Sequence, residues 1–226
     1  MAVNQGLVLC INKPLGWTSA DVVRKVRFRL QRLWNIKKIK VGHAGTLDPL
    51  ATGLLILCVG KATRLANLFQ AQEKEYHAGI KFGATTVSYD LEHPIDATYP
   101  WKHIDRAGLL NILDGFLGKQ LQLPPVYSAK VIDGTRAYEL ARQGVEIPEM
   151  KKNSIEIYAL EIMEFSPPQL LLKIKCSKGT YIRSLARDLG EALNSGAHLI
   201  SLHRSQSGEY KSKNAFSMEE FEILFH

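Results

Sequence analysis

The sequence predicts an α+β fold, with a mixed, mainly antiparallel sheet flanked by helices. Several segments alternate apolar and polar residues with the period of a half-buried strand. Others place apolar residues three or four positions apart, as amphipathic helices do. The two kinds of segment follow one another without a strict strand–helix–strand repeat, which argues against a purely parallel sheet. No internal repeat or linker is visible, so we expect residues 1–226 to form a single domain.

The first third of the chain predicts strands and helices in turn. A short apolar strand is expected at residues 7–11, and Thr18 or Ser19 can cap the helix that follows. Residues 54–59 form an unbroken apolar run bounded by glycines, which predicts a buried strand. A helix is expected at residues 62–69. The apolar stripe of the first helix consists of Val22, Val26, Leu30 and Leu33.

The rest of the chain gives weaker signals for some elements. Alternation predicts strands at residues 75–82, 155–159, 170–176 and 199–202. Helical spacing predicts helices at residues 104–117, 137–142 and 180–193, and a capping box at Ser217 opens a last short helix. Residues 85–101 have little periodicity and predict a loop or ragged strands. Two prolines exclude residues 124–130 from a central strand.

Composition narrows the class of protein. The 226 residues are 46% hydrophobic, enough for a real core, and this excludes a disordered protein. No apolar run approaches the ~20 residues that span a bilayer, and the first residues lack a signal peptide, so we expect a cytoplasmic protein without a membrane partner. The cysteines Cys10, Cys58 and Cys176 lie far apart in apolar runs, and no Cys/His spacing resembles a zinc site. We therefore expect no disulfide, metal or cofactor, and a monomer by default.

Positive charge is concentrated in one block. The chain carries a net charge of +7, and residues 24–40 contain eight cations and no acid. Solvated helix faces usually mix both signs, so a block of one sign favours a polyanionic partner, nucleic acid first and an acidic membrane second. The eight are Arg24, Lys25, Arg27, Arg29, Arg32, Lys37, Lys38 and Lys40.

A polar, glycine-containing segment leads into the buried strand at residues 54–59. It carries His43 and Asp48, and Pro49 stiffens the chain directly after the carboxylate. Catalytic groups are often mounted on such a loop at the mouth of a core strand. An Asp before Pro is also a common turn former, and a His beside glycines a common loop hydrogen-bonder. The spacing alone names no reaction.

Two residues at the start of the helix at residues 180–193 suggest an anion. Tyr181 and Arg183 lie in its first turn, on the flanks of the apolar stripe. A cation there faces the positive end of the helix dipole. We therefore expect Arg183 to have an anionic partner, either a carboxylate elsewhere in the fold or a phosphate.

Several segments together resemble one family. HAGTLDPLATGLL at residues 43–55 is similar to the active-site motif of the bacterial tRNA pseudouridine-55 synthases, the TruB family. Four further segments are similar to segments of the same family, in the same order along the chain: NKPLGWTS, PPVYSAKVIDGTRAYELARQG, KGTYIRSLARDLG and GAHLISLHRSQSG. The resemblance covers roughly residues 7–210.

The resemblance implies a pseudouridine synthase fold and an isomerase. Such an enzyme breaks the N-glycosidic bond of a uridine in the T-loop of tRNA, turns the base and rejoins it to the ribose through carbon, without cofactor or metal. Asp48 matches the catalytic aspartate, and His43 the histidine that helps hold the target nucleotide out of the loop. Tyr76, otherwise read as a core tyrosine, matches the residue that stacks on the base. Tyr181, Arg183 and Leu202 match pocket residues, with Arg183 pairing with the catalytic carboxylate.

The resemblance is incomplete in two places. Many members continue into a small C-terminal RNA-binding domain, and we expect none within residues 1–226. The basic helix at residues 22–34 and the following Lys37, Lys38 and Lys40 would then bind more of the RNA phosphates. Residues 85–94 look looser than the family's usual form, which leaves their role open. Three alternatives stand beside the tRNA enzyme: a tRNA-binding folding chaperone, a guide-RNA-dependent pseudouridine synthase and a metal-dependent nuclease.

Overall fold

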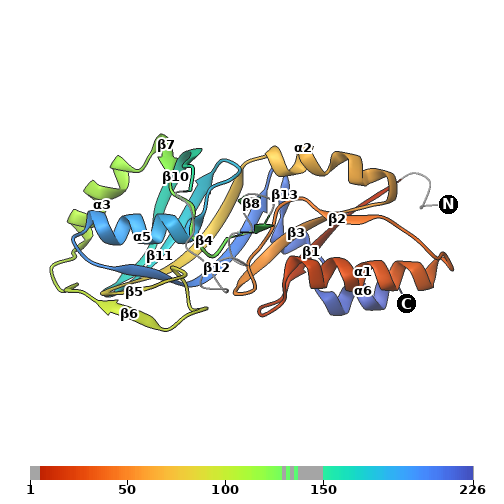
Figure 1. The fold of residues 1–226 in the computed structure, drawn as a ribbon, viewed down its shortest axis with the longest axis horizontal. Coiled ribbons are helices and arrows are strands. Elements are labelled where there is room, and N and C mark those ends of the chain that lie inside the picture. The colour runs from red at the N-terminus through yellow and green to blue at the C-terminus, as the bar shows by residue number, and fades with distance from the viewer. Residues whose placement is uncertain (1–5, 129–130, 133–134, 137–149, 226) are drawn as a thin grey trace. The chain divides into compact units, whose positions relative to one another are not determined.

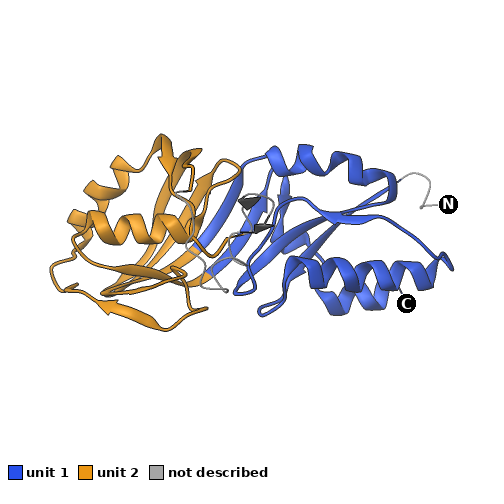
Figure 2. Ribbon diagram, viewed as in Figure 1, with its two compact units in different colours: residues 1–77, 202–226 blue, residues 78–201 orange. Residues whose placement is uncertain are grey.

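The computed structural model describes residues 6–128, 131–132, 135–136 and 150–225. Two compact units divide the chain, as Figure 2 shows: unit 1 is Met1–His77 with Leu202–His226, and unit 2 is Ala78–Ser201. Residues 7–13 pair antiparallel with residues 53–59, whereas residues 202–204 pair in parallel with residues 51–53, so the expected α+β class with a mixed sheet is confirmed. The helix expected at residues 137–142 lies outside the described residues, and the single domain over residues 1–226 stays a prediction.

The sheet of unit 1 is built around strand β3, Ala51–Val59 (Figure 1). Strand β1, Leu7–Lys13, lies antiparallel to β3, with Leu7 opposite Val59 and Lys13 opposite Gly53. Strand β2, Val41–His43, also pairs with β3 in the antiparallel sense. Strand β12, Ala197–Ser207, pairs with β3 in parallel, with Leu202 opposite Ala51. The apolar run at residues 54–59 is fully buried, as its composition predicts.

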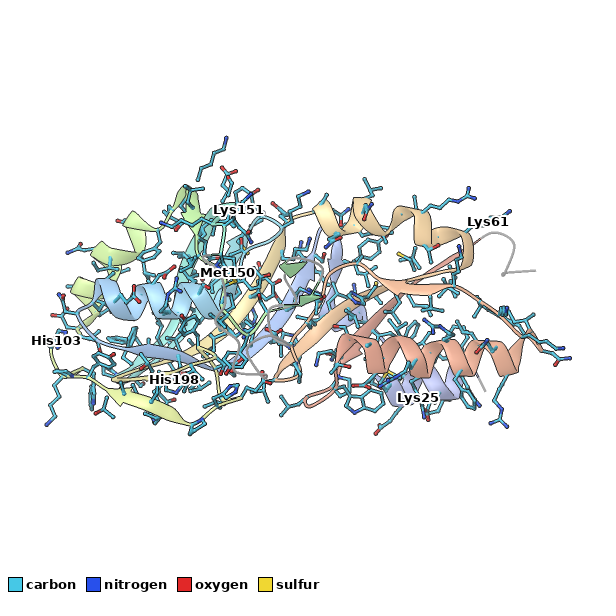
Figure 3. All side chains as sticks on the ribbon, in the orientation of Figure 1. Lys25, Lys61, His103, Met150, Lys151 and His198 are labelled. Carbon is cyan, nitrogen blue, oxygen red and sulfur yellow. The ribbon has the colours of Figure 1, made fainter. Side chains whose placement is uncertain are left out.

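Two helices of unit 1 begin at predicted caps. The hydroxyl of Thr18, rather than that of Ser19, caps helix α1, Ser19–Leu33, and Asp21 completes the capping box. The predicted stripe is buried except at its end, where Leu33 is exposed. Helix α6, Met218–Leu224, opens with the expected Ser217 capping box. Helices α1 and α6 are neighbours, because Lys25 Nζ lies 2.6 Å from Glu222 Oε1; Figure 3 labels Lys25 on α1.

The helix expected at residues 62–69 is wrong at its start. Residues Gly60–Leu65 form a 3₁₀ helix, η2, and only Ala66–Ala71 form an α-helix, α2. The hydroxyl of Thr63 donates to the carbonyl of Gly60 at 2.8 Å. A side-chain bond to a carbonyl three residues back competes with α-helical bonding, which accounts for the tighter first turns.

The described residues of unit 2 include a run of four neighbouring strands, in which β10 is antiparallel to both β11 and β7, and two helices. The strands follow the order β4–β11–β10–β7, and β4 and β12 each continue from one unit into the other. Their bounds are β4 Lys74–Phe82, β7 Gly118–Gln122, β10 Asn153–Ser166 and β11 Gln169–Cys176. The helices are α3, Arg106–Gly115, and α5, Ile182–Ala192.

The segment expected as a loop or ragged strands contains a small hairpin. Strands β5, Ala84–Thr86, and β6, Ile95–Thr98, pair antiparallel with one irregularity. Three short strands and a 3₁₀ helix are the remaining described elements: β8 Val131–Ile132 with β9 Thr135–Arg136, β13 Tyr210–Lys211 beside β12, and η3 Ser212–Asn214. Helices in the described part of the chain are all too short or too polar to cross a membrane.

Candidate active site

The loop between β2 and β3 carries Asp48 in unit 1. Ala44 and Leu47 of this loop are buried, at 2% and 3% exposure, and anchor it to the core, whereas Asp48 itself is half-buried. A bond of 2.9 Å from the Ala44 amide to the carbonyl of Ile56 fixes the point where the loop leaves the sheet. The small and apolar residues of the loop therefore anchor it to the core, while Asp48 stays partly accessible to solvent.

Every backbone carbonyl from Gly45 to Pro49 accepts a hydrogen bond. The first two carbonyls accept from the guanidinium of Arg204, at 3.1 and 3.4 Å. Leu47 exchanges two bonds with the hydroxyl of Ser19, and Asp48 accepts from the Ala51 amide at 3.1 Å. A loop held at five consecutive residues keeps the side chain of Asp48 in one position, which positional catalysis requires.

Lys13 closes this set of contacts from β1. Its ammonium donates to the carbonyls of Pro14, Trp17 and Pro49, at 3.0, 2.6 and 3.3 Å, and its side chain is fully buried. The Gly16 amide donates to the same Pro49 carbonyl at 2.9 Å. Burial lowers the pKa of Lys13 from its ordinary value to about 8; the negative charge of Asp48 opposes this shift and the positive charge of Arg204 adds to it.

This low pKa predicts a dependence of stability on pH. Lys13 has a lower pKa in the folded protein than in the unfolded chain, so between about pH 8 and 10.5 the unfolded chain binds more protons. The free energy of unfolding should therefore rise with pH in this window, by up to about 1.4 kcal/mol per pH unit from Lys13. Urea unfolding of wild type and Lys13→Met, measured at pH 7.5 to 10, checks this. The free energy of unfolding of wild type minus that of Lys13→Met should increase with pH. Parallel curves would contradict it.

Four expected site residues lie in unit 1. His43 ends β2, and Asp48 follows on the loop. Tyr76 is 9% exposed on the buried face of β4. Leu202 lies beside Ala51, the residue that follows the loop, and is half-buried. The structure thus gathers Asp48, His43 and Leu202 around the two ends of one loop, while their functional roles stay predictions.

Two expected site residues, Tyr181 and Arg183, lie in unit 2. Arg183 is buried, with 5% of its side chain exposed, and its Nε lies 3.6 Å from Oδ2 of Asp90, which is 9% exposed. Its Nη1 donates to the carbonyl of Ser88 at 3.2 Å. The anionic partner expected from the helix dipole is therefore confirmed as a carboxylate of the same unit. A pairing of Arg183 with Asp48, implied by the resemblance, joins residues of different units and stays a prediction.

Tyr181 was expected in the first turn of the helix, but it lies immediately before that turn. Tyr181 is the N-cap of α5, with an extended backbone, instead of a residue of the first helical turn. The side-chain amide of Gln122 explains this, because it accepts from the Tyr181 amide at 2.8 Å and donates to the Tyr181 carbonyl at 3.0 Å. Arg183 is likewise buried with the apolar stripe rather than on its flank.

Sequence reasoning missed the residues that support the two clusters. Ser19, Lys13 and Arg204 hold the loop, and Asp90 and Gln122 order the start of α5. One signal was present for Lys13: Leu9, Ile11 and Lys13 share the buried face of β1 at intervals of two. The others depend on contacts between residues far apart in the chain, which leave no local pattern.

Comparison with known proteins decides the family. Residues 31–182 match the model of the TruB family pseudouridylate synthase N-terminal domain, and residues 183–226 match that of the tRNA pseudouridylate synthase B C-terminal domain. The chain belongs to the TruB family. Membership in this family of pseudouridylate synthases confirms the expected enzyme class, isomerases that form pseudouridine.

Curated TruB relatives match nearly the whole chain. The tRNA pseudouridine synthase B of Phocaeicola vulgatus is 51% identical over 221 residues, which are 98% of this chain and 94% of the relative. That of Bacteroides fragilis is 52% identical with the same coverage. The enzyme of Clostridium kluyveri is 43% identical over 94% of this chain and 71% of its own length.

Solved structures agree with the TruB fold. A Cbf5–Nop10–Gar1 complex contains a chain with a TM-score of 0.72 and 24% identity, covering 99% of this chain and 56% of the other. A chain of an H/ACA RNP bound to a substrate RNA containing 2′-deoxyuridine has a TM-score of 0.69 and 24% identity, covering 98% of this chain and 53% of the other. At this identity the likeness concerns the fold alone.

Proposed function

We propose that this TruB-family chain converts a uridine in the T-loop of tRNA to pseudouridine, with Asp48 as the catalytic carboxylate. The observation that carries the proposal is the clamped loop: a half-buried Asp whose neighbouring carbonyls, from Gly45 to Pro49, are all held by hydrogen bonds. The relatives at 51% and 52% identity are named tRNA pseudouridine synthase B, which supports tRNA as the substrate.

The chemistry requires the base to leave the folded loop. The base of a uridine inside a stacked T-loop cannot be released from its ribose and turned in place. The nucleotide must therefore be flipped into a pocket, where its base stacks on an aromatic ring. We assign the stacking to Tyr76 and the pocket lining to Tyr181 and Leu202, with His43 holding the nucleotide. Asp48 then acts as a nucleophile or as a base in its ionised form, which a nearby cation favours. Lys13 supplies positive charge close to Asp48.

We place this activity in the cytoplasm and expect it to need neither metal nor cofactor. In the described part of the chain, no three His, Cys, Asp or Glu side chains are arranged to hold a metal ion. The monomeric state also stays a prediction. The chaperone alternative differs in one respect, since chaperoning of tRNA does not require Asp48.

Isolated stem–loops test the proposed substrate. A T-arm hairpin and an anticodon hairpin of equal length are incubated with wild-type protein, and pseudouridine is mapped by reaction with a carbodiimide. We expect product in the T-arm hairpin alone. Product in the anticodon hairpin at a similar rate would contradict the T-loop assignment while leaving the pseudouridine synthase activity intact.

The basic segment after α1 offers a surface for RNA phosphates. Several cations of the block already have partners: Arg24 pairs with Asp21, Lys25 pairs with Glu222, and Arg29 donates to the Glu222 carbonyl. Lys37, Lys38 and Lys40 are exposed and form no ion pair with any acidic side chain that the structure describes. Cations without an internal partner are the ones most available to a polyanion.

Neutralising these three lysines should weaken tRNA binding mainly at low salt. For Lys37→Gln/Lys38→Gln/Lys40→Gln we expect the slope of log K against log salt to fall by up to about 2. Filter binding at 50 to 300 mM salt measures it. The triple variant Lys102→Gln/Arg106→Gln/Lys119→Gln removes the same charge from exposed positions of unit 2 and serves as the control. An unchanged slope in the first variant, or equal changes in both, would count against a local phosphate site.

A further inference from the structure

Arg204 is a buried cation whose described partners are all backbone carbonyls. The side chain is among the largest that are fully buried, at 2% exposure. Its Nε donates to the carbonyl of Leu54 at 2.7 Å, and its two terminal nitrogens donate to Gly45 and Thr46. In the part of the chain that the structure describes, no carboxylate lies within ion-pair distance of this guanidinium.

We propose that Arg204 is a positioning residue for the isomerisation: it joins the Asp48 loop to strands β3 and β12 and so fixes where the carboxylate lies. The inference rests on the proposed function, because it takes Asp48 as the catalytic group. It adds a residue that contacts neither substrate nor reacting atoms and acts through the loop backbone.

The shape of the guanidinium suits this role. Nε is bound to the core strand β3, while the fork of Nη1 and Nη2 spans two successive carbonyls that precede Asp48 by two and three residues. A planar group with donors in fixed directions can bridge three acceptors on two segments. A lysine ammonium is a single point at the end of a flexible chain and cannot reproduce this bridge.

Gly53 lets the backbone of β3 approach Arg204 closely, and Gly45 gives the loop a backbone conformation that favours glycine. Gly53 has a φ of +101°, and a Cβ there would lie 2.4 Å from the carbonyl oxygen of Arg204. Gly45 has a φ of +111°, and a Cβ there would lie 3.5 Å from Nη1. Only glycine readily adopts such positive φ values. The close strand pair, with Arg204 opposite Gly53, therefore fixes the origin of the side chain as firmly as its hydrogen bonds fix the end.

The same strand also carries an expected pocket residue. Leu202 and Arg204 are two positions apart in β12, in unbroken register with Ala51 and Gly53, so they point to the same face of the sheet. One strand segment thus holds the loop of Asp48 and presents Leu202. This arrangement sets the position of the carboxylate relative to a residue assigned to the base pocket.

Packing alone does not explain a charged side chain here. An apolar side chain of similar volume would fill the space without the cost of desolvating a charge. The arginine is stabilised by its three carbonyl acceptors, and two of those three belong to the catalytic loop. The contacts therefore indicate that the arginine determines the position of the loop.

Arg204→Lys and Arg204→Gln test the inference with full-length tRNA. Lys keeps the charge without the fork, and Gln keeps amide donors without the charge. We expect both variants to lower the single-turnover rate about 100-fold, the effect of a small misplacement of a catalytic group, while tRNA Kd stays within about threefold. Lys74→Met is the matched control, because Lys74 is also a buried cation bound to carbonyls, those of Phe69, Gln70 and Gln72. It should lose stability but keep its rate.

The outcomes separate the inference from the function on which it rests. If Gln prevents folding, the milder Lys variant gives the answer, measured well below its unfolding temperature. A folded Arg204→Lys with the wild-type rate would overturn the positioning role, as would rate losses that are equal in Arg204→Lys and Lys74→Met. Wild-type protein that forms no pseudouridine in tRNA would instead overturn the proposed function.

Discussion

Replacing Asp48 by asparagine is expected to lower the single-turnover rate of pseudouridine formation at least about 10³-fold, because an amide can neither attack nor carry the negative charge. The hydrogen bonds that hold the loop run through its backbone carbonyls, so the loop should keep its position. tRNA Kd should stay within about threefold. Release of tritium from position 5 of uridine measures the rate, and filter binding the affinity.

A matched variant controls for the loss of one carboxylate. Asp105 caps helix α3 by accepting a bond from the Gly108 amide at 2.7 Å, a role that asparagine performs about as well. Asp105→Asn should therefore retain the wild-type rate. If Asp48→Asn keeps more than about a tenth of the activity, Asp48 is not the catalytic carboxylate.

Removing the carboxylate of Asp90 should destabilise the protein strongly. Asp90→Asn removes the carboxylate that lies 3.6 Å from Nε of the buried Arg183, and breaking a buried pair in this way costs about 3 kcal/mol. Urea unfolding gives the free energy.

A more exposed pair nearby provides the comparison. Asp188 lies 2.5 Å from Arg187, with 25% of its side chain exposed. The side chain of Arg187 is 12% exposed, so this pair has more access to water than the Arg183–Asp90 pair and should contribute less to stability. Equal losses in Asp90→Asn and Asp188→Asn would show that burial of the Arg183–Asp90 pair does not determine its strength.

Local patterns predicted most of the scaffold. The alternation at residues 155–159 and 170–176 marks the β10–β11 hairpin, and the apolar run at residues 54–59 marks the buried part of β3. The Ser217 capping box and the buried stripe of α1 were also predicted correctly. These features depend on neighbours within one or two turns, which a sequence displays directly.

The parts that escaped prediction depend on distant partners. Arg204 reaches the loop across 158 and 159 residues, and Asp90, which pairs with Arg183 of helix α5, lies between the two strands of the hairpin at residues 84–98. The hydroxyl of Ser19 could equally have capped α1, and only the structure shows that Thr18 does so while Ser19 bonds the loop. A polar residue that can satisfy several roles gives no local signal for the one it takes.

The site was predicted unevenly for the same reason. Asp48 and His43 could be singled out because glycine and proline mark their loop in the sequence. The family resemblance supplied their expected roles. The need of Arg183 for an anion followed from its place near a helix N-terminus, and Asp90 meets it. The identity of that anion could not be read, because residues 85–94 have no periodic pattern.

The most direct test of the central claim is nucleotide-resolution mapping of pseudouridine in an unmodified full-length tRNA transcript. The transcript is incubated with wild-type protein or with Asp48→Asn, at concentrations that saturate binding and without added metal or nucleotide. The account predicts one new pseudouridine with wild type, at the T-loop uridine, and none with Asp48→Asn. Binding of the tRNA by both proteins with no modification by either would contradict it and favour the chaperone function.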